Sequence, residues 1–104
     1  MGVDRTDYLF YGLDVGYDNV DYDRDEDVIN GVPNAPFDMV YDGMSGKYAM
    51  AGKVIAKSDR YDGLNFQEIS PDMLPDVSGL KDQVEERFGP QDKPFKLYLF
   101  SHFS

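Results

Sequence analysis

A dense run of acidic residues near the start of the chain limits what this sequence can fold into more than any other feature. Seven of the fourteen residues from Asp14 to Asp27 are acidic. Four aspartates in this acidic run occupy alternate positions: Asp21, Asp23, Asp25 and Asp27. So much like charge cannot enter a hydrophobic core, so we expect the run to be solvated or to face cations. The cations could belong to a metal ion or to a basic protein surface.

The negative charge belongs mainly to the N-terminal part of the chain. The 104 residues carry a net charge of −10. Residues 1–43 contain eleven acids against Arg5 and Arg24, a net of −9, and residues 44–104 contain nine acids against eight bases, a net of −1. We therefore expect no direct binding of nucleic acid or of an anionic membrane, because both need a positive field. The charge favours a basic protein partner and salt-sensitive association.

Length and composition are typical of one domain spanning residues 1–104. Hydrophobic residues make up 41% of the chain, with 8 Tyr and 7 Phe, which is too aromatic for a disordered segment. The absence of cysteine excludes disulfides, thiolate catalysis and Cys-ligated metal, and it fits a reducing cytoplasm. No apolar run approaches the roughly 18 residues that a membrane-spanning helix needs.

Alternating and helical patterns predict the secondary structure. Strands are expected at 8–15, 37–41, 47–57 and 96–103, with a further short strand at 64–69 and a helix at 76–88. Glycines and polar residues at 42–46 indicate a hairpin, and the last strand, apolar on both faces, is expected to be central and beside the first. This order predicts an α+β fold in which one C-terminal-half helix packs on a mostly antiparallel sheet of four to five strands.

The acidic run is expected to lie in a long loop at about 16–36. The turn-rich segment Asn30-Gly31-Val32-Pro33-Asn34-Ala35-Pro36 closes this loop, and a loop of that length is usually functional or mobile. Strand alternation places Lys47, Lys53 and Lys57 on one face of the 47–57 strand. The sequence leaves open whether these lysines neutralise the acidic loop within the same molecule.

Sites for catalysis are not evident, and we predict a protein that is not an enzyme and has no catalytic residues. The single histidine, His102, follows Ser101 in an expected strand, so the two side chains diverge and cannot form a dyad. We interpret His102 as a surface or partly buried strand residue. With 20 acids, some carboxylate pair will always fall at a catalytic distance, so such a pair has no specificity.

Calcium is the metal that the acidic run fits best. Asp21, Asp23, Asp25 and Asp27 match positions 1, 3, 5 and 7 of an EF-hand loop. Position 6 is Glu26 where that loop needs glycine, and position 12 is Val32 where it needs glutamate. A calcium-binding structural or virion-associated module is therefore the alternative function. No cofactor is otherwise expected.

Protein binding is the leading functional hypothesis. If residues 21–27 are extended, their alternate aspartates lie on one edge about 6.5 to 7 Å apart. This spacing resembles that of phosphates along a nucleic-acid strand, so the edge could occupy a groove meant for a phosphate backbone. Tyrosines would add the amphipathic anchors common at binding hot spots. The predicted partner-binding residues are Tyr17, Asp18, Asp21, Tyr22, Asp23, Asp25, Glu26 and Asp27.

Three segments carry a resemblance to known sequences: Met-Gly-Val-Asp-Arg-Thr-Asp-Tyr-Leu at residues 1–9, Tyr-Asp-Gly-Met-Ser-Gly-Lys-Tyr at 41–48 and Lys-Val-Ile-Ala at 53–56. They resemble a group of small uncharacterised bacteriophage proteins, over about half the chain. The resemblance implies expression in the bacterial host cytoplasm. It also implies a small acidic accessory protein that binds, and inhibits, a basic host protein. It transfers no activity and no site residues.

Overall fold

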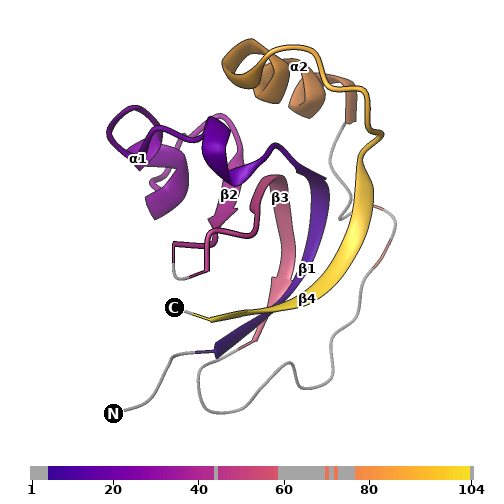
Figure 1. The fold of residues 1–104 in the computed structure, drawn as a ribbon. Helices are drawn as coiled ribbons and strands as arrows, with labels where there is room; N and C mark the ends of the chain where they lie inside the picture. Colours follow the sequence, from indigo (N-terminus) through magenta and orange to yellow (C-terminus); the bar gives the residue numbers. More distant parts are fainter. Residues whose placement is uncertain (1–4, 44, 59–69, 71, 73–76, 104) are drawn as a thin grey trace.

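The fold is α+β, as the sequence predicts. The computed structural model describes residues 5–43, 45–58, 70, 72 and 77–103 (Figure 1). In chain order the elements are β1 (Arg5–Asp14), a 3₁₀ turn η1 (Tyr17–Asn19), α1 (Tyr22–Asn30), β2 (Asp38–Tyr41), β3 (Ala49–Lys57), α2 (Val77–Phe88) and β4 (Lys96–Phe103). The expected strand at 64–69 lies outside the described residues.

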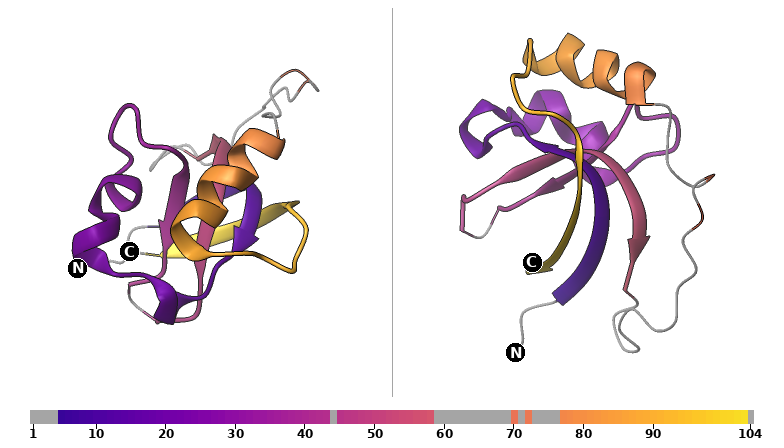
Figure 2. Two further views of the ribbon diagram at one scale, coloured as in Figure 1. Left: turned by 90° about the horizontal axis from the view of Figure 1, so that it is seen from above. Right: turned by 90° about the vertical axis from the view of Figure 1, so that its right-hand side faces the viewer.

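The four strands form one antiparallel sheet in the order β2-β3-β1-β4. The sheet is strongly curved, and both helices lie at the end where β1 finishes (Figure 2). The consecutive strands β2 and β3 pair antiparallel, with Tyr41 opposite Ala49, so they form the predicted hairpin. Among the described residues, no helix is long and apolar enough to cross a membrane.

A pair of facing glycines marks a close approach of strands β1 and β3. Gly12 lies opposite Gly52, and a Cβ on Gly12 would sit 2.1 Å from the carbonyl oxygen of Ala51. Real Cβ atoms do not come this close to backbone, so the local strand geometry requires glycine. Glycine kinks of this kind are a common way to curve a sheet.

Both faces of the sheet carry a hydrophobic cluster. The cluster beneath the helices contains Leu13 of β1, Ala51 of β3, Val28 of α1 and Val84 of α2. The opposite face is aromatic: fully buried Phe10 packs with the half-buried rings of Tyr8, Tyr48, Tyr98 and Phe100. Neighbouring residues of β1 point to opposite sides of the sheet, so this strand contributes side chains to both clusters.

Two expectations about the strands are wrong. The last strand, β4, does lie beside β1, but it is an edge strand and not a central one. Its apolar residues Leu97, Leu99 and Phe103 are exposed, whereas the intervening aromatic residues are half-buried. The lysines also do not share a face: Lys53 lies opposite Tyr11 and Lys57 lies opposite Tyr8. A bulge between these two pairs reverses the alternation, so these lysines lie on opposite faces.

The largest correction concerns the acidic run. The segment expected to be a loop at 16–36 contains η1 and the two-and-a-half turns of α1. Because the aspartates from 21 to 27 are helical or cap a helix, they do not form an extended edge. The spacing of about 6.5 to 7 Å expected for a phosphate mimic in strand conformation does not apply to them.

Candidate functional site

Local signals fix both ends of α1. Asp21 is the N-cap residue, with φ −107° and ψ 109°, and its carboxylate accepts hydrogen bonds from the backbone N–H groups of Asp23 at 3.1 Å and Arg24 at 3.4 Å. Further acids in the first turn favour the helix because they face the positive end of its dipole. Gly31 ends the helix in the left-handed conformation, at φ 65° and ψ 39°, which a glycine adopts without strain.

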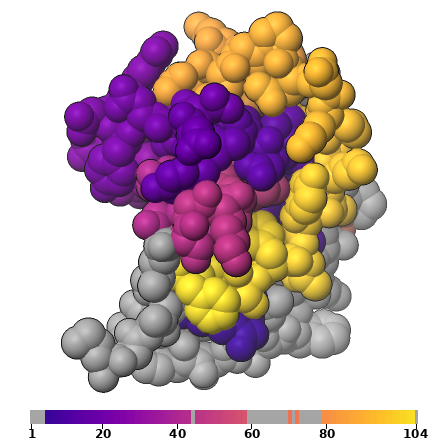
Figure 3. Space-filling view, viewed as in Figure 1, coloured from indigo at the N-terminus to yellow at the C-terminus, as the bar shows by residue number. Residues whose placement is uncertain are grey.

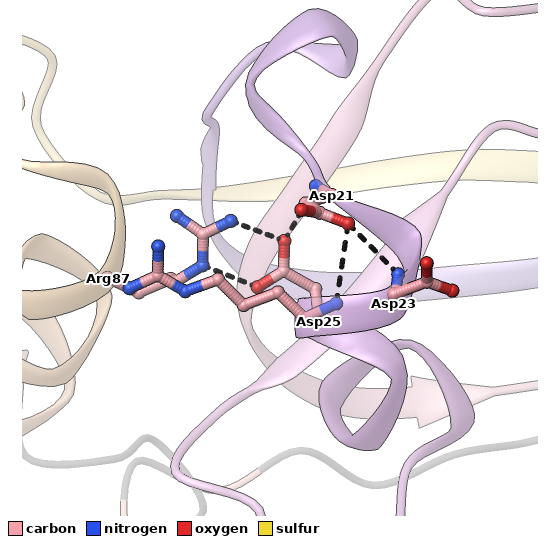
Figure 4. A network of polar contacts seen from close by, with 5 residues as sticks. Asp21, Asp23, Asp25 and Arg87 are labelled. Carbon is pink, nitrogen blue, oxygen red and sulfur yellow. Dashed lines mark hydrogen bonds and ion pairs between the residues drawn. The ribbon is translucent and has the colours of Figure 1, made fainter.

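A buried ion pair ties α1 to α2. Asp25 is only 3% exposed, and its carboxylate accepts two hydrogen bonds from Arg87, at 2.5 Å from Nε and 2.7 Å from Nη2 (Figure 4). The same carboxylate also accepts the backbone N–H of Asp21 at 3.0 Å. The Arg87 guanidinium stacks over the ring of Phe88 at 4.6 Å. A paired, fully hydrogen-bonded carboxylate of this kind holds α1 in one orientation.

On the outward face of α1, three acids form no ion pair with the cations of the described residues. Asp23, Glu26 and Asp27 are exposed and lie at i, i+3 and i+4, so they share one side of the helix. Asp25 and Val28 occupy the opposite, buried side. In the space-filling view α1 protrudes at the upper left of the molecule (Figure 3). We call these three residues the exposed acidic face.

Three tyrosines gather beside this face. The rings of Tyr17 and Tyr41 stack with centroids 5.0 Å apart and an interplanar angle of 9°. Tyr22, at the first turn of α1, lies 6.3 Å from Tyr41 and is 52% exposed. The pKa of the Tyr41 hydroxyl is raised, mainly because it is hydrogen-bonded with Tyr17. This tyrosine cluster places a partly exposed aromatic surface next to the acids.

The structure separates the predicted site residues into two groups. Asp18 of η1 and the exposed acidic face of α1 are available to another molecule, and Tyr17 and Tyr22 join in one cluster. Asp25 is not available, because it is buried against Arg87. Asp21 remains exposed, but its carboxylate caps α1. The acidic ridge is therefore smaller than the sequence predicts.

A loop of the EF-hand kind does not form. The helix α1 contains Asp23, Asp25 and Asp27, and Asp21 caps it. Within the part of the chain that the structure describes, no three acids or histidines lie close enough together to hold a metal ion. The oxygens of Asp21 and Asp25 accept hydrogen bonds from backbone N–H groups and from Arg87. The loop geometry on which the calcium hypothesis depended is therefore wrong.

A cleft of about 380 Å³ opens between α1 and α2 beside the ion pair. Its charged lining has both signs: it includes the cations Arg24 and Arg87 and the acids Asp25, Asp27 and Glu86. Because the strongest donor, Arg87, is already bound to Asp25, the cleft presents no concentrated charge to a ligand.

His102 occupies a different region, on the aromatic face of the sheet. Its Nδ1 lies 2.7 Å from the Tyr48 hydroxyl, and its ring also contacts Tyr8 edge-on. Burial lowers the pKa of His102, with Asp42 opposing the shift. Burial likewise raises the pKa of Tyr48. His102 thus joins β4 to the start of β3 as a packed strand residue.

Sequence reasoning missed two residues that shape the site. Arg87 lies 62 positions from Asp25, and only its place in the last turn of an expected helix was visible in the sequence. Tyr41 ends β2, where its aromatic character suited an ordinary strand residue. Comparison with protein-family models, with curated proteins and with solved structures found no match.

Proposed function

We propose that this chain is a small, non-enzymatic accessory protein of bacteriophage type that binds a basic surface on a protein of the bacterial host, in the host cytoplasm. The observation that carries the proposal is the exposed acidic face of α1 lying directly beside the tyrosine cluster. An exposed acidic face without neighbouring aromatic residues would indicate only a solvated surface. Charge beside a half-exposed, pre-stacked aromatic surface is typical of a protein-binding site.

The ion pair between Asp25 and Arg87 supports this function indirectly. It removes one acid from the surface and in exchange fixes α1 against α2. A fixed helix presents Asp23, Glu26 and Asp27 without the ordering cost that a mobile loop would incur on binding. Preorganisation of this kind favours binding at a given contact area.

The two parts of the site are assigned different roles. The exposed acids raise the rate of association with a basic partner, because opposite charge steers diffusional encounter. Tyr22, which is half-exposed, and the Tyr17–Tyr41 stack supply apolar area and hydroxyl groups that slow dissociation. A basic surface that itself binds nucleic acid would be blocked by such an acidic protein, so the proposed outcome is inhibition of the host protein by competition.

Capture from bacterial lysate tests the proposal. The probe is the tagged full chain, compared with a variant that neutralises the exposed acidic face (Asp23→Asn, Glu26→Gln, Asp27→Asn). A matched control removes three exposed acids elsewhere (Asp72→Asn, Asp82→Asn, Asp92→Asn), so both variants have the same net charge.

We expect the chain and the control to retain a basic protein at low salt and the acidic-face variant to lose it. Nucleic acid should then compete with the chain for the captured protein. Equal capture by the two variants would place the binding site elsewhere, and no capture of any basic protein would remove the proposed function.

A further inference from the structure

Within the described residues, the edge of β4 that faces away from β1 has no strand partner. In the described residues β4 pairs only with β1. Leu97, Leu99 and Phe103 lie on the face of β4 opposite the aromatic cluster, which we call its outer face, and they are 50%, 72% and 51% exposed. Natural proteins usually protect long edge strands with inward charges, proline or bulges. The eight residues of β4 contain no proline, and their one unambiguous charge, Lys96, stands at the first position.

The direction of the backbone groups on β4 follows from β1. The backbone N–H of Asp7 donates to Ser58 Oγ, and its backbone carbonyl accepts from the Ser58 N–H, both at 2.8 Å. The backbone polar groups of Asp7 therefore point toward the β3 side of β1. Backbone groups alternate along an antiparallel strand, so those of Tyr8 face β4 and its opposite residue Phe100. The outward N–H and C=O groups of β4 therefore belong to Leu97, Leu99, Ser101 and Phe103.

The distribution of acidic residues decides whether a second copy of this acidic chain can approach the β4 edge. The carboxylate of Asp7, on the neighbouring strand β1, is engaged by Arg5 at 2.9 Å and by the Ser101 hydroxyl, so this negative charge beside β4 is paired. The exposed acidic face belongs to α1, which packs against β2 at the opposite side of the sheet order. In Figure 1, α1 lies at the upper left, whereas β4 begins at the right and curves toward the lower left at its C-terminal end. Two copies that met at β4 would each carry α1 beside the other edge strand, β2.

We propose that two copies of this chain associate through their β4 edges, about a two-fold axis, to form one continuous antiparallel sheet in the order β2-β3-β1-β4-β4-β1-β3-β2. An axis at Leu99 places the most exposed apolar side chain opposite its own counterpart and pairs Leu97 with Ser101 of the second copy. Outer-face residues then meet outer-face residues, as a continuous sheet requires. This inference is independent of the proposed function, because it uses the other edge of the sheet.

Sedimentation over a wide concentration range tests the association. Wild type should form a reversible dimer that becomes tighter at high salt, because salt screens the repulsion between two chains of net charge −10. Leu99→Lys would place two like charges directly opposite each other, and it should weaken dimerisation about tenfold or more. A chain that stays monomeric at every concentration, or a dimer that Leu99→Lys leaves unchanged, would overturn the proposal.

A cysteine cross-link gives a second readout that does not depend on the stability of a charged variant. The chain has no cysteine, so Leu99→Cys provides a single thiol. In the proposed pairing its Cα would lie about 5.5 Å from the same atom of the second copy, which is within disulfide reach. Lys53→Cys on β3, also exposed, is the matched control. We expect rapid oxidation to a covalent dimer for Leu99→Cys alone; equal rates for the two variants would contradict the β4 interface.

Discussion

Asp25 shows how one residue can have a role opposite to the one its neighbours suggest. It stands in a run in which every second residue is an aspartate, yet it is the one member that is buried and paired with an arginine of another helix. The helical period explains the difference. Asp25 and Val28 share the inward side of α1, whereas residues two positions away from Asp25 point elsewhere.

Loss of the Asp25 carboxylate should strongly destabilise the fold. Asp25→Ala leaves Arg87 without its partner in a largely buried position, and we expect the free energy of unfolding to fall by about 3 kcal/mol in urea denaturation. Asp23→Ala, on the exposed side of α1, should cost about 0.5 kcal/mol. The double variant Asp25→Ala, Arg87→Ala should be less destabilised than the sum of its single variants. Similar losses for Asp25→Ala and Asp23→Ala would show that the ion pair does not hold α1.

His102 should make stability depend on pH. Burial lowers its pKa in the folded state, so the unfolded chain binds the proton more readily. Stability should therefore fall as pH drops from about 6.5, the unfolded pKa, through the lower folded pKa, and the contribution is constant above that window. His102→Gln should lack this part of the pH profile, and parallel profiles for wild type and variant would contradict the assignment.

Regular elements were predictable from the sequence, whereas α1 was missed. The four strands and α2 follow simple periodicity, and their boundaries fall within two or three residues of those expected. For α1 the signals were present at its ends: an N-capping aspartate at 21, acids in the first turn, and Gly31 followed by Pro33. The number of like charges dominated the interpretation. The conformation of the acidic run is decided by the capping signals at the ends of α1 and by the contact with Arg87. The composition of the run does not decide it.

The candidate site was predictable in part for the same reason. Tyr17, Tyr22 and the exposed acids were identified from residue type and local density, which need no tertiary information. Their partner Tyr41 and the clamp from Arg87 come from distant segments, and a single sequence does not reveal such contacts. The position of β4 at the edge was likewise hidden, because apolar residues on both faces are usually typical of a central strand.

The curvature of the sheet should depend on the glycine pair. Gly12→Ala would force a Cβ against the Ala51 carbonyl, so β1 and β3 must separate locally. We expect a loss of about 2 kcal/mol or more in the free energy of unfolding, measured by chemical denaturation. Gly43→Ala is the control: its Cβ would make only an ordinary contact at 3.5 Å with the Tyr41 ring, and it should change stability by about 0.5 kcal/mol at most. Equal effects would mean that the strands have room at Gly12.

At the scale of the whole molecule, charge and apolar surface are kept apart. The acids of α1 and the tyrosine cluster lie by β2, and the exposed apolar row lies on β4 at the far edge of the sheet. Added salt should therefore act in opposite directions on the two proposed contacts. It should weaken binding of a basic partner through α1 and strengthen pairing of two copies through β4.

The rate of association with the captured partner, measured against ionic strength, tests the central claim that α1 presents a preformed acidic surface. Wild type and the control variant with three neutralised acids outside α1 should show the same steep fall in association rate as salt increases. The variant lacking the exposed acidic face should associate more slowly at low salt and show a much flatter dependence, with its melting temperature close to that of wild type. Identical salt dependence for all three proteins would contradict the claim.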